Sequence, residues 1–184
     1  LLHKEFHEQE YNRAGGVFHM VQLWVNLPAK DKMTQPKYQA LAKAEMGRVE
    51  LPKGGEVEII AGEFNGIKGP GTTFTPVNMF NVRPAKGETV ELEFPANFTT
   101  FVLAIEGSGR INGTGELKTD HLALLATDGE RFTIEATEGN STFLVLSGEP
   151  IDEPIASYGP FLMNTQAELA QAIDDFNSGK FGRL

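Results

Sequence analysis

The chain has 184 residues, of which 16 are Lys or Arg and 25 are Asp or Glu, so its formal net charge at pH 7 is −9. An acidic chain without a run of basic residues argues against direct binding to nucleic-acid phosphates. The absence of cysteine from the sequence excludes a disulfide framework, a thiol nucleophile and a zinc finger.

No apolar stretch of the sequence approaches the roughly 20 residues needed to span a bilayer, and no signal-peptide pattern is present. We therefore expect no membrane partner and a cytoplasmic location. The sequence begins at Leu1 rather than at a methionine, so we expect residues that precede its N-terminal motifs to be missing from it.

The N-terminal residues contain a cluster with metal-binding chemistry. His3 and Glu5 are two positions apart, so they would share one face of an extended strand, and His7 would join them if the strand continued. Imidazole and carboxylate donors suit Zn, Fe, Mn, Ni or Cu. Two or three such ligands leave coordination positions open for a substrate. The alternative is a solvated, poorly ordered terminus.

The next segments predict a strand and a short helix. Residues 17–27 are apolar and rich in β-branched side chains, which predicts a strand that ends before Pro28. A short helix is expected near residues 35–45, with Thr34 as its cap and Pro36 in its first turn.

Short apolar stretches separated by turn residues follow. They predict strands at residues 57–61, 72–82, 89–94, 98–105, 121–126, 132–136 and 142–146. Strands of this length and spacing indicate a β-sandwich or barrel. The glycine-rich stretches 107–109 and 113–115 lie between strands, so they predict hairpin turns rather than phosphate-binding loops.

The last element is a predicted helix with a clear start and an apolar stripe. Thr165 and Glu168 form a capping box, and Gly179 marks the end of the helix. The stripe consists of Leu169, Ala172, Ile173 and Phe176. Apolar residues at this spacing form one face of a helix, which we expect to pack on a barrel.

Several strings resemble the pirin family. They are H-x-E at residues 3–5, HMVQLWVNLP at 19–28, PKYQ at 36–39, GEFNG at 62–66, SGEP at 147–150 and YGPFLMNT at 158–165. These strings are spread over essentially the whole chain. Pirins are bicupins, with two β-barrel domains in tandem and one non-haem metal, usually iron, in the first barrel.

The resemblance implies an all-β cupin fold, a double-stranded β-helix or jelly-roll barrel, in the form of a bicupin remnant. Residues 1–46 would be the C-terminal remainder of the first, metal-binding barrel together with a connector helix. Residues 47–184 would be the second cupin barrel with its C-terminal helix. We expect the chain to need a partner, either the missing N-terminal segment of the first barrel or the same segment swapped from a neighbour.

The resemblance also assigns metal ligands. The family holds its metal with three histidines and one glutamate, from an early His-x-His and a later His-x-Glu. This chain matches only the second motif, so His3 and Glu5 carry over as two of the four ligands. No His-x-His occurs in the chain, and His7 receives no family role.

A second metal site is not expected in the second barrel. Counting back from its turn glycine places Phe94, Ala96 and Thr100 at the positions where a cupin has its first three ligands. Phe132 stands in the place of the last cupin histidine. His121 is the one histidine of this barrel, and a single histidine on an apolar strand is more often structural. We predict that the second barrel holds no metal.

Two classes of function follow from the resemblance. The first is a flavonol (quercetin) 2,3-dioxygenase with one divalent non-haem metal, usually iron, in which Glu5 also accepts the proton of the substrate hydroxyl. The second is a non-enzymatic, redox-sensitive regulator that binds transcription factors or metabolic enzymes. The fold alone does not choose between them. A third reading is that the isolated chain, with two of the four ligands, binds no metal and has no activity.

Overall fold

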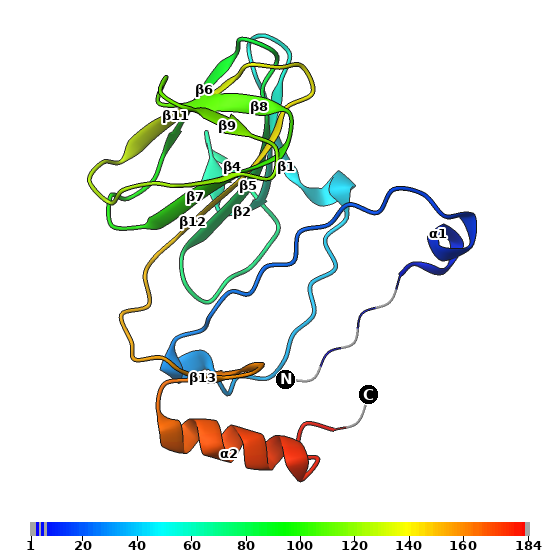
Figure 1. Ribbon diagram of the computed structural model, residues 1–184, viewed down its shortest axis with the longest axis vertical. Helices are drawn as coiled ribbons and strands as arrows, with labels where there is room; N and C mark the ends of the chain where they lie inside the picture. Colours follow the sequence, from blue (N-terminus) through cyan, green and yellow to red (C-terminus); the bar gives the residue numbers. More distant parts are fainter. Residues whose placement is uncertain (1–2, 4, 6, 183–184) are drawn as a thin grey trace. The chain divides into compact units, whose positions relative to one another are not determined.

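The computed structural model describes residues 3, 5 and 7–182, and it divides into two compact units (Figure 1). The first unit combines the N-terminal residues up to Lys37 with the C-terminal residues from Ile151, and the second unit is Tyr38–Pro150. Among the residues described, no helix is long and apolar enough to cross a membrane.

The unit Tyr38–Pro150 is a β barrel made of two antiparallel sheets, which confirms the predicted cupin fold. The larger sheet has the order β1 (Gly47–Glu50), β2 (Glu56–Ala61), β5 (Val77–Arg83), β12 (Thr142–Gly148), β7 (Thr99–Glu106) and β10 (Leu122–Leu124). The smaller sheet has the order β6 (Thr89–Glu93), β11 (Arg131–Ala136), β8 (Ser108–Ile111) and β9 (Glu116–Lys118). A separate hairpin joins β3 (Glu63–Phe64) and β4 (Ile67–Lys68).

The barrel core lies between the two sheets. Side chains alternate along a strand, so β2 buries Val57 and Ile59 completely toward the core. Phe80 on β5 and Phe143 on β12 are equally buried. Burying such apolar side chains is the main stabilising contribution to the barrel.

Each strand predicted between residues 57 and 146 overlaps a strand of the barrel. The strand predicted from residue 72 begins at Val77, after Pro76, because a proline lacks the N–H that a sheet ladder needs. The stretch 113–115 lies in the hairpin turn between β8 and β9, as predicted. The stretch 107–109 is not a hairpin turn, because Ser108 and Gly109 belong to β8 and because β7 and β8 lie in different sheets. Gly107 has a φ of +70° in the turn between β7 and β8, and Asn112 and Gly113 form the β8–β9 turn, both with positive φ.

The other unit contains little regular structure. Its elements are α1 (Gln9–Ala14), the 3₁₀ helix η1 (Ala29–Asp31), the hairpin β13 (Ala156–Tyr158) and β14 (Phe161–Met163), and α2 (Gln166–Asn177). The capping box of α2 is confirmed, because the Glu168 N–H donates to Thr165 Oγ1 at 3.2 Å and the Thr165 N–H donates to Glu168 Oε2 at 2.8 Å. The apolar face of α2 packs on the β13–β14 hairpin, with Phe176 edge-on to Phe161 at 5.8 Å between ring centres. The expected packing of this face on a barrel stays a prediction.

Two local predictions are wrong in this structure. Residues 17–27 form no strand, because a strand needs hydrogen-bonding neighbours and no strand in the described ranges pairs with them. The short helix expected near residues 35–45 is reduced to the 3₁₀ helix η2 (Lys43–Glu45), since the residue before Pro36 is disfavoured in the helical region. The expected domain boundary after residue 46 stays a prediction, although the structure groups residues 151–184 with residues 1–37.

Candidate metal centre

His3 and Glu5 lie side by side. Their closest polar atoms, His3 Nδ1 and Glu5 Oε1, are 3.7 Å apart, and both side chains are more than half exposed to solvent. Together they present an imidazole and a carboxylate, which are ligands that non-haem iron accepts. Their assignment as ligands stays a prediction, because the described residues supply two of the four donors that the family uses.

Gln22 is a third residue at this pair, and the sequence assigned it no role. Its side-chain amide nitrogen Nε2 donates a hydrogen bond to Glu5 Oε1 at 3.1 Å. The two residues are 17 positions apart, so no periodicity links them. Gln22 belongs to the string HMVQLWVNLP. The resemblance of that string to pirins is the feature of the sequence that could have marked Gln22 as a functional residue.

His7 has different neighbours. Its ring lies 4.9 Å from the ring of Phe18, between centroids, at an angle of 40°. The Tyr11 hydroxyl of α1 donates to the carbonyl oxygen of Val17, beside this ring pair. Within the ranges that the structure describes, no group of three or more His, Cys, Asp or Glu side chains is placed to hold a metal ion.

The second barrel has a pocket of about 150 Å³. It is lined by three of the four residues that the sequence places at cupin ligand positions, namely Phe94, Thr100 and Phe132. The rings of Phe94 and Phe132 are 6.0 Å apart, and the Thr100 and Ser147 hydroxyls are hydrogen-bonded at 2.8 Å. Phenyl rings offer no donor to a metal ion. The prediction that this barrel is metal-free rests on these side chains and stays a prediction.

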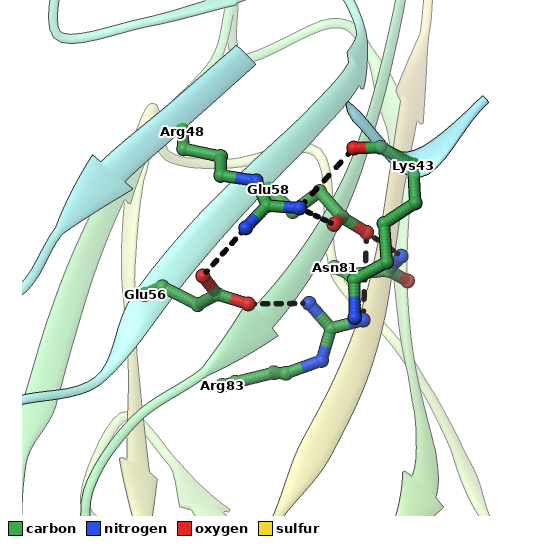
Figure 2. A network of polar contacts seen from close by, with 6 residues as sticks. All are labelled: Lys43, Arg48, Glu56, Glu58, Asn81 and Arg83. Atoms are coloured by element: carbon green, nitrogen blue, oxygen red, sulfur yellow. Dashed lines mark hydrogen bonds and ion pairs between the residues drawn. The ribbon is translucent and has the colours of Figure 1, made fainter. Parts of the chain in front are cut away.

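A cluster of paired charges lies on β1, β2 and β5 (Figure 2). Arg83 Nη1 lies 3.0 Å from Glu56 Oε1, and Arg83 Nη2 lies 3.4 Å from Glu58 Oε1. Arg48 Nη2 lies 3.6 Å from Glu58 Oε2, and it also donates to the carbonyl oxygen of Lys43 at 3.1 Å. Through Arg48, the cluster therefore links η2, the short helix just before β1, to the larger sheet of the barrel.

The carboxylate of Glu58 is the buried member of this cluster, with its side chain 6% exposed. Burial alone would raise the pKa of Glu58, but the hydrogen bond from Asn81 and the positive charge of Arg83 outweigh it, so the pKa lies below the ordinary value. Because the charged form of Glu58 is already hydrogen-bonded and paired, this cluster is suited to holding structure rather than to exchanging protons.

Two polar residues of the family strings hold the first unit together. Asn26 Oδ1 accepts a hydrogen bond from Lys32 Nζ at 2.7 Å. Asn164 Nδ2 donates to Glu153 Oε2 at 2.9 Å, and the same oxygen accepts from the backbone N–H of Ala29 at 2.6 Å. We call Ala29, Glu153 and Asn164 the clasp. It joins a residue near the start of the chain to two residues near its end.

Comparison with known proteins identifies relatives over the full chain. The family model for the pirin C-terminal cupin domain matches residues 79–182, which is more than half of the chain. A Pseudomonas aeruginosa protein provisionally named a quercetin 2,3-dioxygenase is 41% identical over 184 residues, covering 100% of this chain and 64% of that protein. Pirin-1 of Arabidopsis thaliana is 36% identical, covering 99% of this chain and 62% of that protein.

A solved structure shares both sequence and fold. The crystal structure titled quercetin 2,3-dioxygenase from Acinetobacter baumannii has 42% sequence identity and a TM-score of 0.81, with 86% of this chain and 55% of that chain covered. The chain spans less than two thirds of the length of each of these three proteins.

Proposed function

This chain belongs to the pirin family, and we propose that it is the C-terminal part of a metal-dependent flavonol 2,3-dioxygenase acting on quercetin-like substrates. The observation that carries the proposal is the adjacent His3 and Glu5 pair, in a chain 41–42% identical to proteins named for this activity. The rest of the first barrel, in the same polypeptide or from a neighbour, would supply the other two ligands.

The two residues have distinct tasks in this proposal. His3 would hold the metal through an imidazole nitrogen, and Glu5 would hold it through a carboxylate oxygen. A bound divalent metal, iron in the usual case, would supply a binding point for the flavonol oxygens and the redox chemistry with dioxygen. A carboxylate within hydrogen-bond reach of the substrate hydroxyl also accepts its proton, which makes Glu5 the candidate base.

Metal content and quercetin turnover of the full-length protein test this proposal together. We expect stoichiometric iron and oxygen-dependent loss of quercetin absorbance in the wild type. His3→Ala and Glu5→Gln should each lose most of the metal and the turnover. His121→Ala is the matched control, because this exposed histidine lies in the other unit and should change neither quantity.

Each contrary result has a definite meaning. Full metal content in both variants would show that the ligand assignment is wrong. Bound iron without turnover of any flavonol would reject the enzymatic proposal and favour the non-enzymatic, redox-sensitive regulator. A wild type without metal would reject both.

A further inference from the structure

The carboxylate of Glu5 is oriented by a neighbouring side chain. Glu5 Oε1 accepts the hydrogen bond from Gln22 Nε2 at 3.1 Å and lies 3.7 Å from His3 Nδ1. For the other oxygen, Oε2, no hydrogen bond or ion pair is found among the residues described. One carboxylate oxygen of Glu5 therefore has a defined protein donor in Gln22.

A glutamine has the right chemistry for this task. Its amide N–H fixes the orientation of a carboxylate without neutralising it, whereas a lysine or arginine would compete electrostatically with a bound cation. Residues that hydrogen-bond to metal-ligating carboxylates and histidines fix their orientation, and their loss typically lowers metal affinity.

The segment that carries Gln22 is itself anchored, although it forms no strand. Asn26 Oδ1 and the carbonyl oxygen of Leu27 both accept hydrogen bonds from Lys32 Nζ, at 2.7 and 2.9 Å. Two residues further along, the Ala29 N–H is held by Glu153 at 2.6 Å. These contacts restrict the backbone just after Gln22, so its amide has a defined place from which to reach Glu5.

We propose that Gln22 is a positioning residue for the metal centre, which would hold the carboxylate of Glu5 in the orientation in which it binds the ion. This inference rests on the proposed function, because it assumes that Glu5 is a ligand. In this role Gln22 acts through its hydrogen bond to Glu5.

The test is the affinity of the full-length protein for Co²⁺, measured by competition with a chelator, in wild type and Gln22→Met. Methionine matches the length of glutamine and lacks the donor. We expect the dissociation constant to rise about 10- to 100-fold, with a changed Co²⁺ absorption spectrum. The melting temperature of the metal-free protein should be unchanged, because the bond lies on the surface of the described chain. Gln9→Met, the same change at an exposed position of α1, is the matched control and should bind Co²⁺ as the wild type does.

The possible outcomes are separable. Equal affinity and equal spectra in wild type and Gln22→Met would overturn the role of Gln22 while leaving the proposed function intact. A weaker affinity accompanied by a lower melting temperature of the metal-free protein would show a structural role and overturn it as well. If the wild type binds no Co²⁺ or iron, the proposed function fails, and the inference fails with it.

Discussion

Glu88 shows how a single carboxylate organises two loops of the second barrel. Its side chain is buried, with the residue 2% exposed. It accepts backbone hydrogen bonds from Lys53 at 2.7 Å, Gly55 at 3.2 Å and Ala85 at 2.9 Å. Burial alone would raise the pKa of Glu88, but these three N–H donors outweigh it and lower the pKa below the ordinary 4.5.

Glu88→Gln should therefore destabilise the barrel and weaken its dependence on pH. We expect a loss of about 1–3 kcal/mol at pH 7, because one acceptor oxygen is replaced by an NH₂ that faces N–H donors. Since folding lowers the pKa of Glu88, its contribution is present above the unfolded-state pKa and is lost as the pH falls through the lower, folded-state pKa. The wild type should lose stability below about pH 4.5, and the variant should lose less.

Urea unfolding followed by circular dichroism at pH 7 and in the acid range measures both effects. Glu91→Gln on β6 is the control, because Glu91 is exposed. Its replacement should change neither the stability at pH 7 nor the loss of stability in acid. Equal stability of wild type and Glu88→Gln at pH 7 would contradict the role given to these bonds.

At the scale of elements, the clasp holds the turn after the HMVQLWVNLP string to the β13–β14 hairpin. Asn164→Ala removes the bonds from Asn164 Nδ2 to Glu153 at 2.9 Å and to the carbonyl oxygen of Pro154 at 3.1 Å. We expect faster amide exchange in η1 and β13, with no change in β5 or β12, corresponding to a loss of about 1–3 kcal/mol in the first unit.

Hydrogen-exchange mass spectrometry would show this pattern directly. Asn177→Ala, at the exposed end of α2, is the control and should leave exchange in η1 unchanged. Uniformly faster exchange in both units would mean that Asn164 acts on global stability and not on the clasp.

The elements also show which features were predictable from sequence. The capping box of α2 and the Asn112-Gly113 turn depend on neighbours within a few positions, so the sequence predicts them. The proximity of His3 and Glu5 follows equally from their spacing. The hydrogen bonds of Gln22 to Glu5 and of Ala29 to Glu153 join residues 17 and 124 positions apart, and no local pattern indicates them. Residues 17–27 have the composition of a strand, but a strand also requires neighbours.

At the scale of the whole molecule, apolar side chains of residues 17–27 remain exposed. Val17 is 91% exposed, Trp24 70% and Val25 56%. Exposed apolar side chains grouped on one segment favour association, and an unpaired β-type segment can pair with another chain. The 184-residue chain alone should therefore self-associate, despite the mutual repulsion expected from a net charge of −9.

Trp24→Ser combined with Val25→Ser should weaken this association about tenfold or more, because less apolar surface is buried on contact. Light scattering over a range of protein concentrations measures the effect. Tyr158→Ser is the control, since Tyr158 is 71% exposed but lies outside the segment. A wild-type chain that stays monomeric at all concentrations would contradict the prediction.

The division of the chain also fixes an order of events during its synthesis. The first unit is built from both ends of the chain, whereas the second unit is the uninterrupted stretch Tyr38–Pro150. The second unit needs no residue beyond Pro150, so it can fold as the chain leaves the ribosome, while Glu153 and Asn164 have yet to emerge and the first unit still lacks its clasp. Until Glu153 has emerged, the backbone N–H of Ala29 lacks its acceptor, so the segment that ends at Pro28 is held only by contacts within the N-terminal part of the chain.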